Sequence, residues 1–431
     1  MKFIFLNPHK SAFFGVTFLN FISKIHSTTR YKYLIDYIKN HHKHLYLFIT
    51  PSSSSLPTYL SRYFPIKLEI LLWAIINKIN PLSLRIIANY NQIHKNDVLF
   101  SLTLRTFDSN NPPPIPSNCQ FIKTFHITHY NNFTSNIAQN LKKIKPDLLI
   151  AENNLYQNSP YFRKHFDFYK KNVYTLPYVF EKRFHSYLPF NQRLNKCLAT
   201  GSLVNTKDLN DSGQFKDFEA FYKVNSLTPF RKKIFENKDK IKKYVDSYIS
   251  TVFEHKPKYS SSKDGFLTKL INSLYNGISI SQHKYFKFNI VEKYNQYKMF
   301  ITPEEISLPS IGFVEGMACG CAFIGKTDPM YADLGLKPNI HYIGYDGSLK
   351  DLLSKIIYYQ KHPKKLKRIA NNGHRFVIRK FNGPTVAQTF LKDLRSFSRK
   401  KTISSSFIPC NTSSNPQLAH RLPVFKVEIK N

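Results

Sequence analysis

The sequence predicts an α/β protein built from two doubly wound domains that face a cleft. Three observations predict this fold class. The chain has 431 residues, more than one ordinary core holds, and 42% of them are hydrophobic. Short, continuously apolar runs alternate with longer helical stretches, which is typical of parallel strands covered on both faces. The alternation stops at a proline-rich passage after Leu176 and then begins again.

In the first half, six short apolar runs are expected to form one parallel sheet. They are Lys2–Leu6, Leu45–Thr50, Val98–Leu102, Gln120–Phe125, Asp147–Ala151 and Asn172–Leu176. The first domain is therefore expected to span residues 1–176, and residues 177–195 to connect it to the second, because a segment punctuated by proline cannot be one regular element.

The second half repeats the pattern. Strands are expected at Lys196–Gly201, Tyr297–Thr302, Cys321–Gly325 and His341–Tyr345. Helices are expected at Leu308–Cys319, Ser348–Tyr359 and Pro363–Lys380, and along a Lys-rich stretch from Pro229 to about Tyr275. The second domain would span residues 196–383 with a Lys-rich insertion at 208–285, followed by a closing helix at 384–397 and a flexible basic tail at 398–431. Ligands of such sheets bind at the carboxyl ends of the strands, so a ligand is expected between the domains.

The net charge and the cysteine content indicate which partners and which cellular compartment to expect. A formal charge of +36 favours anionic partners such as nucleotides, phosphorylated lipids or nucleic acid. The abundance of Lys, Asn, Ile and Tyr is equally typical of an AT-rich genome, which selects no partner. Five scattered cysteines argue against a disulfide framework and favour the cytoplasm. The apolar run Ile66–Ile79 carries too much charge to be expected to span a membrane, and the first ten residues are not expected to form a signal peptide.

The most informative passage is residues 297–328. A helix is expected to begin near Ser307–Ser310, where free backbone N–H groups suit a phosphate. Glu315 lies two turns into this helix and has no basic neighbour three or four residues away. Hydroxyl groups of a ligand would be suitable partners for its carboxylate.

The run EGMACGCAFIG, Glu315–Gly325, resembles the donor-binding motif of glycosyltransferases with the GT-B fold, which has two Rossmann-like domains facing a cleft. That motif reads E-x7-E, ends in E-A-M-A-C-G and precedes a short strand. The resemblance implies that Glu315 binds the ribose hydroxyls of a nucleotide. It also implies that the backbone of Ser310, Ile311 and Gly312 holds the phosphates or sugar of the donor.

This sequence departs from the motif at its first glutamate, where Ser307 stands. Glu304 and Glu305 are close but out of register. Either one of them replaces the missing glutamate after a loop shift, or this subgroup lacks the interaction. Glu305 is taken as the candidate at the sugar.

Four other segments agree with the resemblance, which covers roughly residues 172–397: 176–184, 196–207, 341–356 and 380–394. It implies that Gly201 and Ser202 lie near the diphosphate, with Lys207 as the nearest cation. In the first domain it implies a histidine facing the donor sugar, for which His129 and His126 are the candidates, and a histidine can also assist proton transfer.

The sequence therefore predicts a glycosyltransferase that moves a sugar from a nucleotide-sugar donor to a glycan or lipid-linked acceptor. The resemblance implies that neither a metal nor another cofactor takes part, and a peripheral contact with the inner face of the membrane is a further expectation. A nucleotide-sugar epimerase or phosphorylase of the same fold is the alternative within enzymes. A basic nucleic-acid-binding protein is the alternative outside them, although no recognition motif supports it and nucleic acid is not an expected partner.

Overall fold

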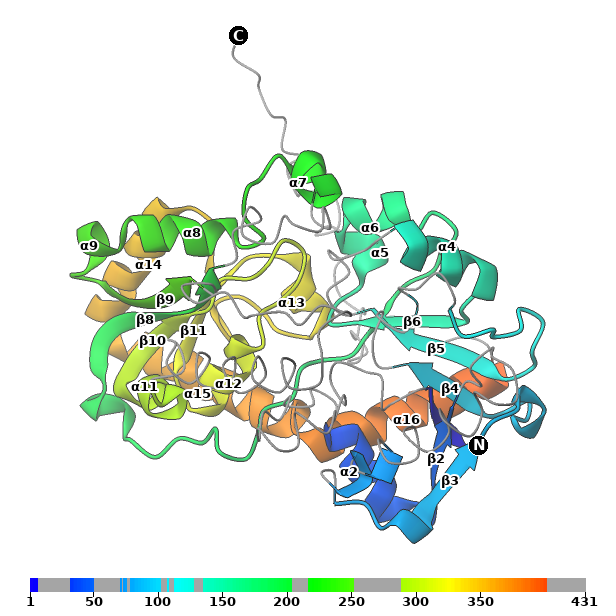
Figure 1. Cartoon of the computed structure of the whole chain (residues 1–431). Coiled ribbons are helices and arrows are strands. Elements are labelled where there is room, and N and C mark those ends of the chain that lie inside the picture. The colour runs from blue at the N-terminus through cyan, green and yellow to red at the C-terminus, as the bar shows by residue number, and fades with distance from the viewer. Residues whose placement is uncertain are drawn as a thin grey trace, which may run out of the picture.

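The computed structural model describes residues 1–6, 32–49, 70–71, 73–75, 78–101, 107, 112–127, 135–203, 216–251 and 288–400 (Figure 1). These residues form two α/β units side by side, each built on one parallel sheet. The predicted fold class is confirmed.

The first sheet has seven strands among the described residues, in the order β3-β2-β1-β4-β5-β6-β7. They are β1 (Phe3–Leu6), β2 (Leu45–Phe48), β3 (Leu84–Ile87), β4 (Val98–Ser101), β5 (Ile122–His126), β6 (Leu148–Ala151) and β7 (Tyr174–Thr175). Every residue of β1, β4, β5 and β6 is buried, because helices cover both faces of the sheet. The helices of this unit are α2 (Lys32–His41), α4 (Ser135–Ile144), α5 (Leu155–Asn158) and α6 (Pro160–His165).

The second sheet has five strands in the described part of the chain, in the order β12-β11-β10-β8-β9. They are β8 (Leu194–Leu203), β9 (Val245–Thr251), β10 (Tyr297–Ile301), β11 (Ala322–Lys326) and β12 (Ile343–Tyr345). The described helices here are α8 (Pro229–Glu236), α9 (Lys238–Ile241), α11 (Ile290–Gln296), α12 (Gly312–Ala318), α13 (Pro329–Asp333), α14 (Leu349–Lys361) and α15 (Pro363–Lys380). The helix α7 (Lys216–Tyr222) follows β8 in the chain but packs against the first unit, where Phe218 contacts Tyr161 of α6.

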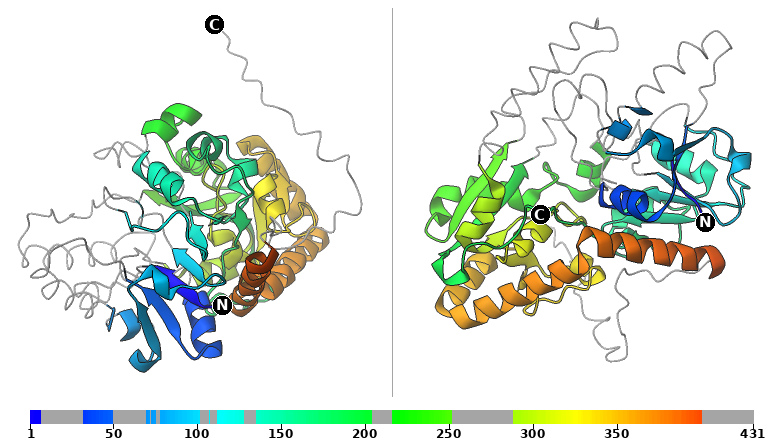
Figure 2. Two further views of the ribbon diagram at one scale, coloured as in Figure 1. Left: turned by 90° about the vertical axis from the view of Figure 1, so that its right-hand side faces the viewer. Right: turned by 90° about the horizontal axis from the view of Figure 1, so that it is seen from below.

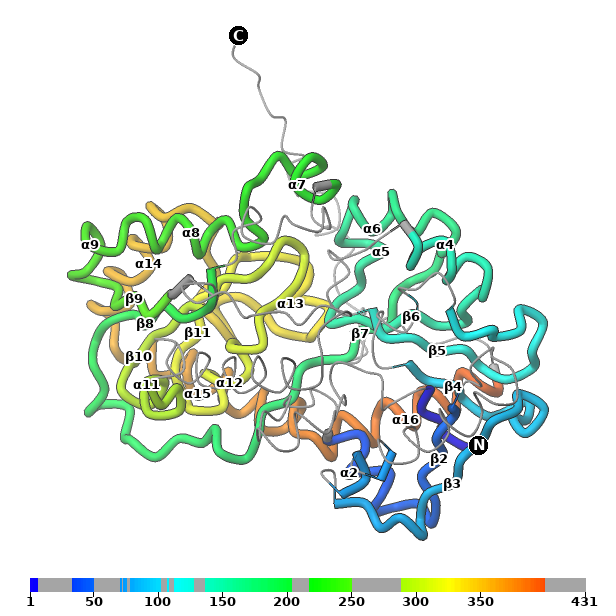
Figure 3. The backbone as a smooth tube through the Cα atoms, in the orientation of Figure 1, coloured from blue at the N-terminus to red at the C-terminus, as the bar shows by residue number. Residues whose placement is uncertain are grey.

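The chain crosses between the two units more than once. After β7 it runs to β8, and after α15 the helix α16 (Gly383–Lys400) returns to the first unit, as the tube in Figure 3 shows. Phe390 of α16 packs in the same apolar cluster as Phe3 of β1, and Tyr174 donates a hydrogen bond of 2.7 Å to Asp393. The view from below in Figure 2 shows α16 lying along the first unit. The expected closing helix is thus present, and it extends from residue 383 to residue 400.

Two edge strands were not predicted. Val245–Thr251 lies inside the stretch expected to be a Lys-rich helix, yet it forms β9 beside β8. This prediction was wrong because Val245 and Ile249 are buried as part of a strand that belongs to the sheet. Part of the supposed insertion is therefore integral to the second unit. Leu84–Ile87, which forms β3, is half-exposed and lacks a continuous apolar run.

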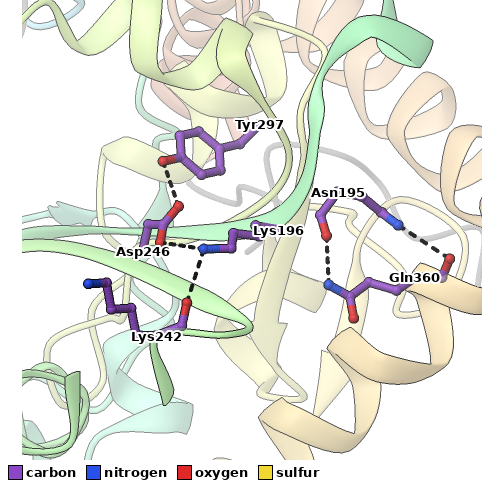
Figure 4. A network of polar contacts seen from close by, with 6 residues as sticks. All are labelled: Asn195, Lys196, Lys242, Asp246, Tyr297 and Gln360. Carbon is purple, nitrogen blue, oxygen red and sulfur yellow. Dashed lines mark hydrogen bonds and ion pairs between the residues drawn. The ribbon is translucent and has the colours of Figure 1, made fainter. Parts of the chain in front are cut away.

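A polar network fastens the amino ends of the strands in the second sheet (Figure 4). Asp246 accepts hydrogen bonds from Lys196 Nζ at 3.0 Å and from the Tyr297 hydroxyl at 2.9 Å. It thus ties together the starts of β8, β9 and β10. The side-chain amide of Gln360 donates to the carbonyl of Asn195 at 2.6 Å and fixes the end of α14 to the same edge. The carboxyl edge, at the opposite end of the strands, is where a ligand site is expected.

Gly316 allows α12 to lie directly on the sheet. A Cβ atom at this position would stand 2.4 Å from the ring of Phe300 on β10. Gly316→Ala is therefore expected to destabilise the protein by about 1–2 kcal/mol, because overpacking outweighs the roughly 1 kcal/mol gained in helix propensity. Chemical denaturation measures this change, with Ser354→Ala on the exposed face of α14 as the control. Equal stability of Gly316→Ala and the wild type would contradict the close packing.

Candidate functional site

The carboxyl edges of the two sheets meet at the boundary between the units. The side chain of Asn153, after β6, donates a hydrogen bond of 2.8 Å to the carbonyl of Ser307, after β10. The N–H of Asn154 donates to Asp333 Oδ2 of α13 at 2.9 Å. Leu308 is 3% exposed and packs in an apolar cluster of the first unit. Loops of both units therefore build this region, which is where open α/β sheets bind ligands.

In the second sheet, the strand order reverses between β8 and β10, and a buried arginine occupies this switch point. Arg231 of α8 donates from Nε to the carbonyl of Pro303 at 2.7 Å and from Nη1 to the carbonyl of Ser202 at 2.9 Å. Gly201 has φ +136, and a Cβ there would lie 2.7 Å from Arg231 Nε. Only glycine satisfies both the backbone angle and the close approach. A positive charge consequently lies between the ends of β8 and β10.

The start of α12 lies against the end of β10. The hydroxyl oxygens of Ser310 and Thr302 are 2.8 Å apart. A Cβ on Gly312 would lie 2.9 Å from Thr302 Oγ1 and 3.0 Å from the Tyr294 hydroxyl, so a larger residue would push the helix away. The carbonyl of Ile311 accepts hydrogen bonds from the N–H groups of the first helical turn, including that of Glu315. Glu315 is partly exposed, whereas its helical neighbours are buried. The structure thus places the start of α12, at Ser310 and Gly312, beside Thr302 at the end of β10, the strand that pairs with β8.

The two glutamates after β10 have different surroundings. Glu304 has one carboxyl oxygen, Oε2, that is buried and accepts no hydrogen bond from the described residues. Burial, together with the nearby carboxylate of Asp328, raises the pKa of this carboxyl to about 7. Glu305 forms an isolated antiparallel bridge with Leu308 in the same turn.

In the first unit, His126 lies beside a carboxylate. It ends β5 and is fully buried, and its Nε2 is 3.9 Å from Oε1 of Glu152, the residue that follows β6. A carboxylate at this place restricts the orientation of the imidazole. The other candidates, His129 and Lys207, lie outside the described residues.

Comparison with known proteins gives one family. The sequence model of a family described as glycosyl transferase-like matches residues 279–392, which include α12 and Glu315. No curated protein sequence matches the chain. This segment is a glycosyl transferase-like domain. The predicted glycosyltransferase is confirmed, and neither the epimerase or phosphorylase nor the nucleic-acid-binding alternative gains support.

Solved structures give weaker likenesses. HepE of Anabaena in complex with UDP is 13% identical, with a TM-score of 0.49, over 92% of this chain and 100% of that one. A glycosyltransferase from Rickettsia africae is 12% identical, with a TM-score of 0.47, over 93% and 99%. Sucrose-phosphate synthase from Thermosynechococcus elongatus is 11% identical, with a TM-score of 0.46, over 92% and 99%.

Four residues near the glycosyltransferase motif were not predicted from the sequence: Glu152, Asn153, Arg231 and Asp333. Arg231 was hidden in a Lys-rich stretch, where no spacing distinguishes one cation from another. Glu152 and Asn153 carried a signal, since polar residues directly after a buried strand lie at the carboxyl edge of a parallel sheet. Asp333 belongs to no sequence motif, and only its hydrogen bond with Asn154 in the structure shows that it lies at the boundary between the units.

Two further findings concern the described residues alone. They contain no group of three or more His, Cys, Asp or Glu side chains that could hold a metal ion. No helix among them has the length and the apolar character needed to cross a membrane.

Proposed function

We propose that this glycosyltransferase binds a nucleotide-sugar donor at the carboxyl edge of the second sheet and transfers the sugar to a glycan or lipid-linked acceptor held by the first unit. One observation carries the proposal. Within the segment that matches the family, the helix bearing Glu315 begins beside the switch point that holds Gly201 and Arg231. This arrangement offers a partly exposed carboxylate for hydroxyl groups and a guanidinium for phosphates.

In this proposal each residue has a role set by its chemistry. Glu315 binds the ribose hydroxyls. The backbone of Ser310, Ile311 and Gly312 faces the phosphates or the sugar, and Gly201 and Ser202 lie near the diphosphate. Arg231 adds a positive charge that opposes the growing charge of the leaving diphosphate, and Lys207 stays a further candidate for that role. The proposal needs no metal ion or other cofactor.

The acceptor side is proposed to include His126, with Glu152 fixing its ring. His129 stays the alternative histidine, and Glu305 is the candidate carboxylate at the sugar. The high positive charge suits an anionic acceptor or a peripheral contact with the inner face of the membrane. Cys119, Cys197, Cys319 and Cys321 are unpaired, which agrees with the proposed cytoplasmic location.

Glu315→Ala is expected to weaken nucleotide binding by roughly 10- to 100-fold, because hydrogen bonds to a charged group are worth about 1.5–3 kcal/mol each. The measurement is the thermal shift of the protein with UDP, GDP and ADP, followed by titration of the nucleotide that gives the largest shift. The matched control is Glu292→Ala, which removes an exposed glutamate from the nearby helix α11.

An oligonucleotide is included in the same thermal experiment. A shift with DNA or RNA and none with any nucleotide would contradict the proposed donor site. An unchanged nucleotide affinity in Glu315→Ala would remove Glu315 from that site and leave the remaining residues to be tested.

A further inference from the structure

The turn that leaves β6 places three consecutive buried side chains at the boundary between the units. Glu152, Asn153 and Asn154 are 1%, 0% and 2% exposed. Glu152 lies beside His126, whereas the next two residues reach the second unit. One short segment of the first unit therefore contacts both the acceptor side and the loop that precedes α12.

The contact of Asn153 holds an unusual backbone conformation. Ser307 has φ +60, a left-handed conformation that is unfavourable for a residue with a side chain. Its carbonyl accepts the hydrogen bond from Asn153 Nδ2 at 2.8 Å, and Asn153 Oδ1 in turn accepts from Asn158 at 3.3 Å. The amide of Asn153 is thus fixed in orientation by a donor on one side and an acceptor on the other. The neighbouring Leu308 packs among first-unit residues, which fixes the same loop a second time.

A second pair of contacts lies beside the first. Asp333 Oδ2 accepts from the N–H of Asn154 at 2.9 Å and from Asn158 Nδ2 at 2.6 Å. The asparagines of the first unit therefore contact two separate parts of the second unit, the loop after β10 and the end of α13, the helix that follows β11. The loop after β10, residues 304–310, also touches the donor-site framework, because Ser310 contacts Thr302 at the end of β10.

We propose that Asn153 is a positioning residue that holds the loop 304–310, so that the contact between the two units sets the shape of the donor-sugar site. The proposal rests on the proposed function, because it assigns this loop to the sugar end of the donor. Ser307 stands where the motif has a glutamate, and here its backbone carbonyl accepts the hydrogen bond from Asn153 of the first unit.

The test uses the full chain and compares Asn153→Asp, Asn153→Ala, Ser307→Gly and the double variant Asn153→Ala with Ser307→Gly. Asn153→Asp keeps the size of the side chain and removes the donor. Both single changes at Asn153 are expected to lower kcat/KM for the nucleotide-sugar donor about tenfold, while the Kd for the nucleoside diphosphate alone changes less than about twofold. Ser307→Gly alone keeps the carbonyl that accepts the hydrogen bond, and its kcat/KM is the reference for the double variant.

The double variant separates positioning from general damage. Glycine adopts the left-handed conformation without strain. The double variant is therefore expected to have a kcat/KM at least about threefold higher than that of Asn153→Ala. A loss of kcat/KM matched by an equal loss of nucleotide affinity, or no recovery in the double variant, would overturn the positioning role.

Hydrogen exchange of the backbone amides gives a readout that does not depend on transfer. Amides of residues 304–310 are expected to exchange about tenfold faster in Asn153→Asp than in the wild type, with the amides of β10 unchanged as the internal control. Equal exchange rates in the loop would overturn the inference. If the wild type neither binds nucleotides nor transfers a sugar, the proposed function fails, and the exchange rates still decide whether Asn153 holds the loop.

Discussion

Arg231→Met is expected to lower the free energy of unfolding by roughly 2–5 kcal/mol and to weaken nucleotide binding in the protein that remains folded. Arg231 is 7% exposed and donates to the carbonyls of Ser202 and Pro303. Methionine fills a similar volume and donates no hydrogen bond, so both buried carbonyls lose a partner at about 1–3 kcal/mol each. The loops after β8 and β10 also lose their link, and the site loses its buried cation.

The measurement is chemical denaturation followed by far-ultraviolet circular dichroism, together with nucleotide titration below the transition. Lys233→Met is the matched control, because it makes the same kind of change on the exposed side of the same helix and is expected to fall within ±0.5 kcal/mol of the wild type. If Arg231→Met retained full stability, the two carbonyl contacts would not hold the edge of the sheet. If it were destabilised but bound nucleotide normally, Arg231 would be structural only.

The strands that the sequence predicted share one physical property. Runs such as Phe3–Leu6 and Leu148–Ala151 are buried on both faces, so they read as continuous apolar segments. The strands that escaped prediction lie at sheet edges. In β9 only every fourth residue is apolar and buried, at Val245 and Ile249, and the surrounding lysines suggested a helix. Because β3 and β9 are only partly buried, they lack the continuous apolar run that marks the central strands.

The residues of the candidate site also fall into a group that the sequence predicted and a group that it did not. Gly312, Glu315 and Gly316 belong to one short helix, so their spacing along the sequence reports their arrangement in space. Arg231 and Pro303 are 72 residues apart, and Asn153 and Ser307 are 154 residues apart. Contacts of this length depend on how whole strands and domains pack, and no local pattern records them. The motif could therefore be predicted, whereas the residues that support it from elsewhere could not.

Glu304→Gln is expected to remove a pH dependence of stability that the wild type shows between about pH 4.5 and 7. Burial raises the pKa of Glu304 from 4.5 to about 7, so across this range the folded protein keeps a proton that the unfolded chain has lost. The stability that this group contributes is fully present below pH 4.5, the pKa of the unfolded chain, and decreases as the pH rises to about 7, the pKa in the folded protein. The loss amounts to roughly 3 kcal/mol, since each pKa unit corresponds to about 1.36 kcal/mol.

The glutamine variant carries a neutral side chain at every pH, so it should match the wild type near pH 4 and exceed its stability near pH 8 by roughly 3 kcal/mol. Denaturation curves of both proteins at several pH values measure the difference, which cancels the contributions of the other titrating groups. Glu305→Gln removes a carboxyl from the same turn and leaves Glu304 in place, so its curve should keep the slope of the wild type. Parallel curves for Glu304→Gln and the wild type would show that Glu304 has the same pKa in the folded and the unfolded protein, which would contradict the effect of burial on its carboxyl.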